Sequence, residues 1–372
     1  MIASALDIPM TSITDRPENR HSPIVESQDF ELLSSYHLEE LNQLVSHELR
    51  TPLTAIRGAL GLLASGRVGH FSEKSLRLLA IAINNTDRLV RLTQAIENDP
   101  AMPLTMVSGA AMARLRLESD LRTALNNNQI QVFFQPIVDI ASKQIRGFEA
   151  LARWQHPSRG WISPGEFIPL AEEIGVVHQL GLQMLRQSCQ QLALWHQQFP
   201  ELAGLSVSVN LSSIQLAELG LVGQIVAILA ETGIKPQYIR LEITESAILD
   251  HSQLALSHLK QLQNLGIQLY LDDFGTGYSS LARLQDMPVD VLKIDRSFVK
   301  NHNWNLIEVI MVLASGLGLQ AIAEGVETPE ELEQLTALNC PLAQGYLFSK
   351  PLNATQATAI LLDPPGSLSP IT

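Results

Sequence analysis

The sequence predicts an α/β protein in which a TIM-like (β/α)8 barrel follows an all-α helical hairpin. Three observations lead to this fold class: helical periodicity between residues 30 and 97, short apolar runs that alternate with amphipathic stretches after residue 118, and polar residues at the ends of nearly all these runs. Runs that are apolar throughout are typical of parallel strands buried on both faces. Eight such units in roughly 250 residues match the size of a (β/α)8 barrel.

The N-terminal part predicts a tail followed by a dimerisation device. Residues 1–28 are polar and rich in turn formers, and we expect them to be disordered. Residues 29–98 predict a helical hairpin, whose first helix carries apolar residues at steps of three and four: Leu41, Val45, Leu49, Leu53, Ile56, Leu60 and Leu63. Because each helix can bury only one apolar stripe, the hairpin should pair with a second copy as a four-helix bundle.

Residues 99–117 contain two prolines and a glycine and predict a linker whose end can be helical. The barrel is expected over residues 118–362, and residues 363–372 form a second tail. Its strands are predicted at residues 131–139, 145–154, 205–212, 239–246, 267–275, 290–295, 319–327 and 342–347. Thr328, Pro329 and Glu331 combine a capping hydroxyl, a proline at the first helical position and a capping-box glutamate, which predicts a helix start.

Composition excludes several classes of protein. Hydrophobic residues make up 46% of the chain and charged residues 17%, which fits a globular protein with a sizeable core. A net charge of −13 disfavours binding to DNA or RNA polymers, although bound cations leave a small phosphate substrate possible. Cys189 and Cys340 suggest neither a disulfide framework nor a zinc ribbon. With no bilayer-spanning run and no secretory signal, we expect a cytoplasmic protein with no membrane partner.

Polar residues end the predicted strands: Glu149, Asn210, Glu242, Asp272, Asp273, Lys293, Glu324 and Gln344. In a barrel of this kind the carboxyl ends of the strands converge on one rim, so these residues should meet in a single pocket. Hard oxygen ligands favour Mg²⁺ or Mn²⁺ over Zn²⁺, and the adjacent pair Asp272 and Asp273 suits two metal ions. Each acid taken alone is equally well explained as a helix cap or a rim ion pair.

A series of motifs extends this pattern: QPIVD (135–139), FEALARW (148–154), VNLS (209–212), LEITES (241–246), DDFGTGYSSL (272–281), LKIDRSFV (292–299), AEGVET (323–328) and QGYLFSKPL (344–352). In this order and at these spacings the chain resembles EAL-domain cyclic di-GMP phosphodiesterases over residues 118–362. The resemblance implies hydrolysis of cyclic di-GMP to linear pGpG by a two-metal mechanism, with Mg²⁺ or Mn²⁺ as cofactors and Ca²⁺ as an inhibitor.

The resemblance also implies a role for each motif residue. Ligands of the first metal would be Glu149, Asn210, Glu242 and Asp272, and ligands of the second Asp272, Asp273 and Glu324. Lys293 would hold or polarise the attacking water or the phosphate, and Gln344 would help to position water; with Glu149 and Asp273 they form the catalytic group. Substrate contacts would be Gln135, Leu151 and Arg153, while Glu245 would anchor the loop after Asp273, which bears on metal binding and barrel pairing.

The segment Ser46 to Leu53, which reads SHELRTPL, resembles the phosphoacceptor box of histidine-kinase dimerisation (HisKA) domains over about residues 30–98. His47 is the candidate phosphoacceptor, it faces away from the apolar stripe, and Pro52 should kink the helix beside it. No segment after residue 98 resembles an ATP-binding kinase domain. Any phosphate on His47 must therefore come from a histidine kinase or receiver-domain protein in trans, as in two-component signalling. The alternative is a plain dimerisation hairpin with an unused histidine.

The sequence thus leaves three functions to be distinguished. The first is a cyclic di-GMP phosphodiesterase that acts as a homodimer and is regulated through His47. The second is a cyclic di-GMP receptor that signals through the hairpin with little turnover. The third is a phosphorelay adaptor in which the barrel only senses nucleotide. The complete set of metal-ligand and lysine positions favours the enzyme, because a receptor needs substrate contacts but no metal chemistry.

Overall fold

The computed structural model describes residues 49–63, 79, 82–83, 86, 89–90, 104–245, 253–275, 284–285 and 287–362. The chain divides into two compact units, Met1–Ala111 and Met112–Thr372. In the first unit residues 49–63 are helical and include Pro52. His47 and the loop 276–280 lie outside the described residues, so their predicted roles stay predictions.

Nine strands and ten helices are present in the described part of the second unit and its leading helix. The strands are β1 (Ile130–Asp139), β2 (Ile145–His156), β3 (Gly160–Ile162), β4 (Ser206–Asn210), β5 (Ile239–Thr244), β6 (Gln268–Phe274), β7 (Val291–Ile294), β8 (Gln320–Ala323) and β9 (Leu342–Ala343). The helices are α3 (Leu104–Asn126), α4 (Pro164–Glu173), α5 (Val177–Gln198), α6 (Ser213–Leu216), α7 (Leu221–Thr232), α9 (Gln253–Asn264), α11 (Arg296–Lys300), α12 (Trp304–Gly316), α13 (Pro329–Ala337) and α14 (Ala354–Leu362). Two short 3-10 helices, η1 (Pro200–Leu202) and η2 (Pro236–Tyr238), precede β4 and β5.

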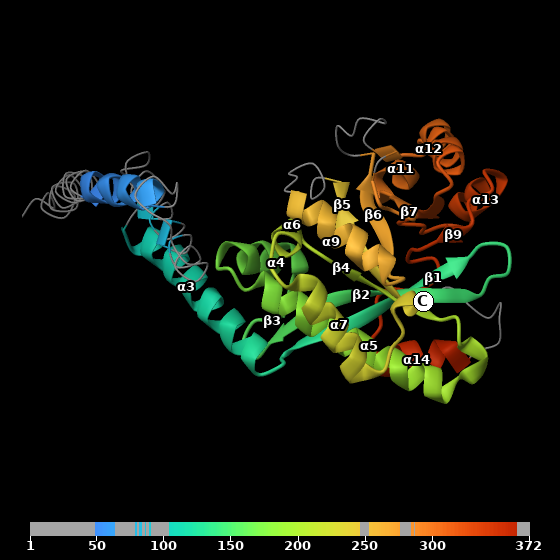
Figure 1. Ribbon diagram of the computed structural model, residues 1–372, viewed down its shortest axis with the longest axis horizontal. Coiled ribbons are helices and arrows are strands. Elements are labelled where there is room, and N and C mark those ends of the chain that lie inside the picture. Colours follow the sequence, from blue (N-terminus) through green and yellow to red (C-terminus); the bar gives the residue numbers. More distant parts are fainter. Residues whose placement is uncertain are drawn as a thin grey trace, which may run out of the picture. The chain divides into compact units, whose positions relative to one another are not determined.

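The sheet closes into a barrel of eight strands (Figure 1). The strand order is β1-β9-β8-β7-β6-β5-β4-β2, and β1 pairs with β2 to complete the ring, while β3 extends β2 as a hairpin. Within the ring, β2 and β4 to β9 all run parallel to one another. Only β1 is antiparallel to both of its neighbours, β2 and β9.

The prediction of eight parallel strands is therefore wrong for β1. Only the short turn between Asp139 and Ile145 joins β1 to β2, whereas a parallel connection needs a crossover of a dozen or more residues. The extra strand β3 was also not predicted, because its three residues form no apolar run. Each of the eight predicted strand segments overlaps an observed strand, although β1 begins one residue earlier and β2 ends two residues later than predicted.

Aromatic side chains fill the layer between β1, β2 and α5. The ring centroid of Trp195 lies 4.9 Å from those of both Phe134 and Phe148. All three side chains are almost fully buried. The indole Nε1 of Trp195 donates a hydrogen bond to Thr358 Oγ1 at 2.8 Å, which fastens α14 to α5. This packing fixes β1 and β2 against the outer helices, and both strands carry predicted site residues.

The α3 helix begins at Leu104, so most of the predicted linker is helical. Its apolar residues Leu117, Leu121 and Leu125 are buried, as expected for one face of an amphipathic helix. His156 Nε2, at the end of β2, lies 3.1 Å from Asp120 Oδ2 of this helix. Among the described residues, no helix combines the length and the apolar character that a membrane span requires.

Candidate active site

The predicted site residues occupy the strands as a barrel site requires. Glu149, Glu242 and Lys293 lie on β2, β5 and β7, Asn210 is the last residue of β4, and Asp272 and Asp273 lie near the end of β6. Glu324 and Gln344 directly follow β8 and β9, and Gln135 lies on β1. Because β2 and β4 to β9 are parallel, the carboxyl ends of these strands face the same rim of the barrel.

Lys293 is the centre of the cluster. Its Nζ atom lies 2.6 Å from Glu242 Oε2, 2.6 Å from Glu324 Oε1, 3.0 Å from Asp272 Oδ1 and 3.6 Å from Glu149 Oε2. The lysine is only 1% exposed. One buried ammonium group therefore faces four carboxylates that the sequence disperses over 176 positions, from residue 149 to residue 324.

Carboxamide groups hold Glu149 from the other side. Asn210 Nδ2 donates to Glu149 Oε1 at 3.0 Å, and Gln344 Nε2 donates to Glu149 Oε2 at 2.6 Å. Gln344 Nε2 also donates to Gln135 Oε1 at 3.1 Å, and Gln135 Nε2 donates to the carbonyl oxygen of Ser349 at 3.2 Å. The structure thus places all the predicted amides in one network with the acids. Sequence reasoning missed Ser349, whose only signal was a serine inside the apolar run LFSKPL.

The surroundings of the cluster shift the pKa values of its acids in different directions. Burial opposes ionisation of Glu149, but the charge of Lys293 and the hydrogen bonds from Gln344 and Asn210 outweigh it and lower its pKa. Burial likewise opposes protonation of Lys293, but the surrounding carboxylates hold its pKa well above its usual value. Glu149 and Lys293 are therefore a charged pair at neutral pH.

Three further acids, Glu242, Glu324 and Asp273, hold protons more tightly than usual. Burial and the charge of Glu149 raise the pKa of Glu242 well above its ordinary value. Burial, opposed by Lys293 and reinforced by Asp272, raises the pKa of Glu324 to about 7. Burial and the charge of Asp272 also raise the pKa of Asp273. One lysine does not neutralise so many carboxylates, so the cluster favours additional positive charge.

The donor set fits divalent cations. Ligand oxygens of Asp272, Asp273 and Glu324 all lie within 4.8 Å of one another, the one such acidic trio among the described residues. Glu242 Oε1 is buried and has no hydrogen-bond partner among the residues that the structure describes, which leaves a carboxylate oxygen that a bound cation would satisfy. Carboxylate and amide oxygens are the ligands that Mg²⁺ and Mn²⁺ prefer, and no sulfur or imidazole ligand is among the predicted metal ligands.

A break in β6 exposes Asp273. The register between β6 and β7 shifts between Leu271 and Phe274, and Asp273 adopts a φ of 54°, a left-handed conformation that is uncommon for aspartate. Asp272 and Asp273 can then both reach the rim, although adjacent residues of a regular strand point to opposite faces. Just beyond the bulge, the backbone N–H of Gly275 donates to Glu245 Oε2 at 3.3 Å, as expected for a residue that anchors this loop.

The predicted substrate contacts surround the same strand ends. Leu151 and Arg153 follow Glu149 at steps of two along β2, so the three side chains share one face of the strand. Arg153 is half-buried, and burial lowers its pKa while the side chains of Tyr346 and Glu149 oppose that shift.

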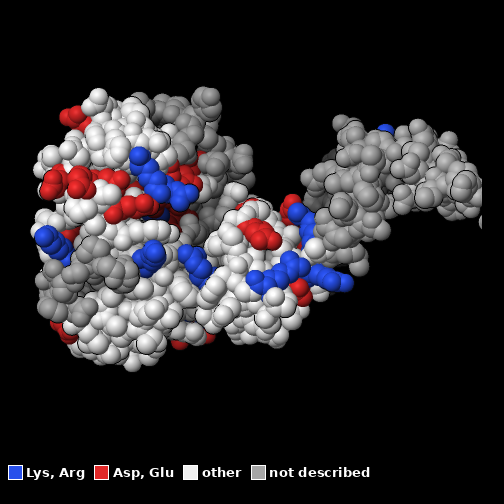
Figure 2. Space-filling model, turned by 180° about the vertical axis from the view of Figure 1, so that it is seen from behind, with Lys and Arg blue, Asp and Glu red and all other residues white. Residues whose placement is uncertain are grey.

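Figure 2 shows acidic side chains gathered on one face of the barrel unit, with a smaller group of Lys and Arg side chains beside them.

Fold and site together define an α/β barrel with a carboxylate-rich cluster at its strand ends. The model of the EAL domain matches residues 118–351, and that of the His Kinase A (phospho-acceptor) domain matches residues 37–98. The chain therefore belongs to the EAL domain family and carries an N-terminal His Kinase A domain.

Similar proteins support this membership. The cyclic di-GMP phosphodiesterase NbdA of Pseudomonas aeruginosa is 40% identical over 250 residues, which are 65% of this chain and 31% of that protein. The cyclic di-GMP phosphodiesterase PdeR of Escherichia coli is 39% identical over 245 residues, 64% of this chain and 36% of that protein. The solved structure of the PaMucR phosphodiesterase in complex with c-di-GMP is 39% identical, with a TM-score of 0.62, and covers 65% of this chain and 99% of that chain. The chain thus spans about a third of the length of both curated relatives.

Proposed function

We propose that the protein is a metal-dependent phosphodiesterase that hydrolyses cyclic di-GMP to linear pGpG. The observation that carries this proposal is the buried Lys293 among Glu149, Glu242, Asp272 and Glu324, next to the exposed Asp273. A protein that only binds a nucleotide gains nothing from so many buried carboxylates, since their mutual repulsion costs stability. The names of the similar proteins give the substrate class.

Six residues would hold two divalent cations, with Asp272 shared between them. Glu149, Asn210, Glu242 and Asp272 are proposed for the first ion, and Asp272, Asp273 and Glu324 for the second. Bound Mg²⁺ or Mn²⁺ would neutralise the carboxylates and polarise the phosphodiester oxygens. We propose that Ca²⁺ inhibits, because it occupies oxygen sites with looser coordination than the Mg²⁺ octahedron.

Side chains of the protein are proposed to stabilise charge, move a proton and bind the nucleotide. Hydrolysis joins a water oxygen to phosphorus and breaks the bond between phosphorus and the 3′ oxygen, which opens the ring and leaves a 5′ phosphate. Lys293, kept protonated by its carboxylate neighbours, holds positive charge where the phosphate gains negative charge. The exposed carboxylate of Asp273 is proposed to take a proton from the attacking water, and Gln344 to orient that water. Gln135, Leu151 and Arg153 are proposed to bind the nucleotide.

The experiment that tests the proposal is the Glu149→Ala variant. Loss of a metal ligand should lower pGpG formation, measured by liquid chromatography with Mg²⁺ or Mn²⁺, by at least about 100-fold. The exposed Glu201 of η1 provides a matched control, and Glu201→Ala should hydrolyse at the wild-type rate. Near-wild-type turnover in Glu149→Ala, or strong turnover with Ca²⁺ alone, would refute the metal assignment. A wild-type protein that binds cyclic di-GMP without producing pGpG would support the receptor alternative instead.

We further propose that residues 29–98 hold two chains together and that His47 accepts a phosphate from another protein. Domains of the His Kinase A type typically dimerise. In the single chain Leu49, Ile56 and Leu62 of the described helix are each about half exposed, which favours a second helix pair as their cover. Phosphate at His47 would add charge beside Pro52 and shift the hairpin between two arrangements that the barrel responds to.

A further inference from the structure

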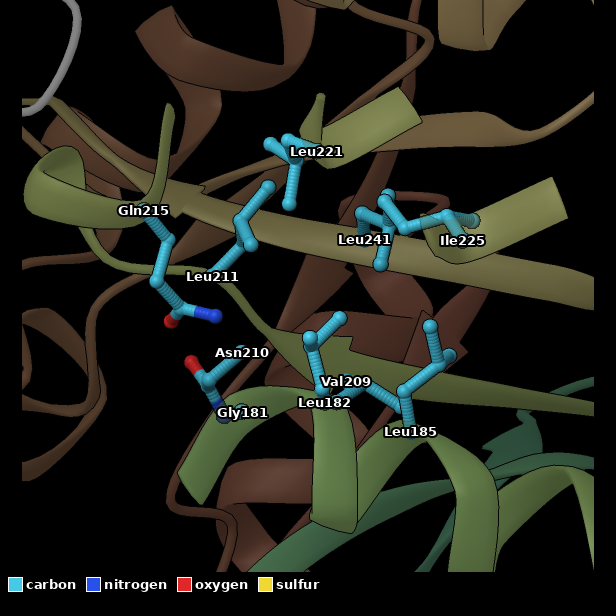
Figure 3. Close-up of a pocket in the computed structure, with 10 residues that line it drawn as sticks. All are labelled: Gly181, Leu182, Leu185, Val209, Asn210, Leu211, Gln215, Leu221, Ile225 and Leu241. Carbon is cyan, nitrogen blue, oxygen red and sulfur yellow. The ribbon is translucent and has the colours of Figure 1, made fainter. Parts of the chain in front are cut away.

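A glycine on an outer helix lies against the segment that carries Asn210. An ideal Cβ at Gly181, in α5, would come within 2.1 Å of Gln215 Nε2, 2.7 Å of its Cδ and 2.8 Å of its Oε1. Real Cβ atoms essentially never approach other atoms this closely. Gln215 is itself 3% exposed, and its carboxamide lies where a side chain at position 181 would stand. Figure 3 shows this carboxamide pointing toward Asn210 and Gly181.

The same carboxamide ties down the residues that follow Asn210. Gln215 Oε1 accepts the backbone N–H of Ser212 at 3.1 Å, while Ser212 Oγ accepts the backbone N–H of Gln215 at 3.3 Å. These two bonds form a capping box at the start of α6. Leu211 is the one residue between Asn210 and Ser212, and its backbone N–H donates to the carbonyl oxygen of Glu242 at 2.8 Å. The backbone that leaves β4 is therefore held on one side by β5 and on the other by Gln215.

The space beside this contact is small. Gly181, Asn210 and Gln215 line a cavity of about 10 Å³, whose remaining walls are mainly leucine side chains (Figure 3). A cavity of that size holds about one water molecule. A methyl group at position 181 would thus push the carboxamide off Ser212, and the displaced amide would lose its buried partner.

We infer that Gly181 and Gln215 are positioning residues for Asn210. Asn210 is the last residue of β4 and is exposed at the rim, so its side chain depends on the backbone that follows it. The Gly181 backbone supports Gln215, Gln215 fixes Ser212, and Ser212 fixes the exit of β4 from which Asn210 reaches Glu149. The inference rests on the proposed function, in which Asn210 is a ligand of the first metal and not of the second.

The test is calorimetric titration of the full chain with Mn²⁺, which reports two sites separately and needs no turnover. Gly181→Ala should weaken the first site by about tenfold, the size of effect typical for residues that orient a metal ligand, and leave the second site unchanged. Gly223→Ala is the matched control: this glycine lies in α7, a helix that lines the same cavity, and nothing lies within 4 Å of its ideal Cβ. That variant should bind Mn²⁺ like the wild type.

Gln215→Ala removes both the obstacle and the capping bond. It should weaken the first site as well, and the double variant Gly181→Ala/Gln215→Ala should be no weaker than Gln215→Ala alone, because the methyl group then meets no carboxamide. Wild-type affinity in Gln215→Ala, equal losses at both sites, or additive losses in the double variant would overturn the inference, and Gln215→Ala decides it even if Gly181→Ala does not fold. Absence of Mn²⁺ binding by the wild type would instead refute the proposed function.

Discussion

Lys293 is the residue on which the balance of charge in the pocket depends. It faces four carboxylates and is almost completely buried, so removing its charge leaves them uncompensated. We expect Lys293→Met to lower the free energy of unfolding of the metal-free protein by about 3–5 kcal/mol in urea titrations. Added Mn²⁺ should stabilise this variant more than the wild type, because the carboxylates of the variant lack the positive charge of Lys293.

Lys300 offers the matched control for that substitution. It pairs with Glu327 at 2.8 Å, but both side chains are more than one third exposed. Lys300→Met should therefore cost less than about 1 kcal/mol. Equal losses in the two variants would mean that the pocket does not depend on its lysine for charge balance.

Glu324 should make the metal-free protein sensitive to pH. Its pKa rises to about 7 in the folded chain from an ordinary value of 4.5. Between these values the folded state keeps a proton that the unfolded state has lost, so the stability from this group is complete below pH 4.5 and is lost as pH rises through 7. The free energy of unfolding of the wild type should therefore fall between pH 4.5 and pH 7. In Glu324→Gln this fall should be smaller by up to about 3 kcal/mol. Urea titrations at several pH values, with a chelator present to remove metal ions, would measure it.

The exposed Glu327, three residues further on, is the control for this charge removal. Glu327→Gln should keep the wild-type dependence on pH. The same titration has a second consequence, because a carboxylate must lose its proton before it binds a metal ion. Mn²⁺ affinity should rise with pH through neutrality in the wild type; a flat profile would show that Glu324 does not bind the ion.

At the scale of elements, α3 makes several side-chain contacts with the barrel, and two of them differ in burial. His156 is 9% exposed, and its Nδ1 accepts the backbone N–H groups of Ser158 and Arg159 at 3.2 Å each. Its Nε2 therefore carries the hydrogen and donates a hydrogen bond to Asp120 Oδ2. The second contact, Arg114 with Glu173, joins two side chains that are each about half exposed.

Removing Asp120 therefore leaves a buried donor without its partner, while removing Arg114 does not. We expect Asp120→Ala to lower the free energy of unfolding by about 1–3 kcal/mol and Arg114→Ala by less than about 0.5 kcal/mol. Thermal and urea unfolding of both variants would measure this. Equal costs would show that the buried histidine does not depend on α3.

Much of this architecture follows from sequence patterns, and the exceptions have physical reasons. The apolar runs locate the eight barrel strands because burial on both faces demands them. Strand direction is not encoded in such runs, which is why β1 was expected to be parallel. The bulge at Asp273 could not be foreseen either, since its left-handed φ depends on the register between β6 and β7. The hydrogen bonds of Gln135 and the contact of Gln215 with Gly181 are long-range, and no local pattern predicts them.

At the scale of the whole molecule, His47 and the barrel should communicate through a dimer. We expect the full chain to elute with about twice the monomer mass of 40.9 kDa in light scattering. At equal dimer content, His47→Glu and His47→Ala should differ in the rate of pGpG formation, because one carries a negative charge and the other does not. Identical rates for both variants and for the phosphorylated protein would mean that the hairpin only dimerises the chain and does not regulate the barrel. A monomer at micromolar concentration would exclude the bundle.

The closure of the ring has a consequence for how the protein is made. Its first strand pairs with its last: Val138 lies opposite Ala343, and Gln135 accepts a hydrogen bond from Gln344, 209 positions away. Contacts of such large sequence separation form late and slowly. A growing chain therefore contains all the proposed metal ligands before β9 leaves the ribosome, yet the hydrogen bonds of Gln344 to Gln135 and Glu149 are still missing. Under the proposed function, we expect a chain that ends before Gln344 to be inactive rather than partly active.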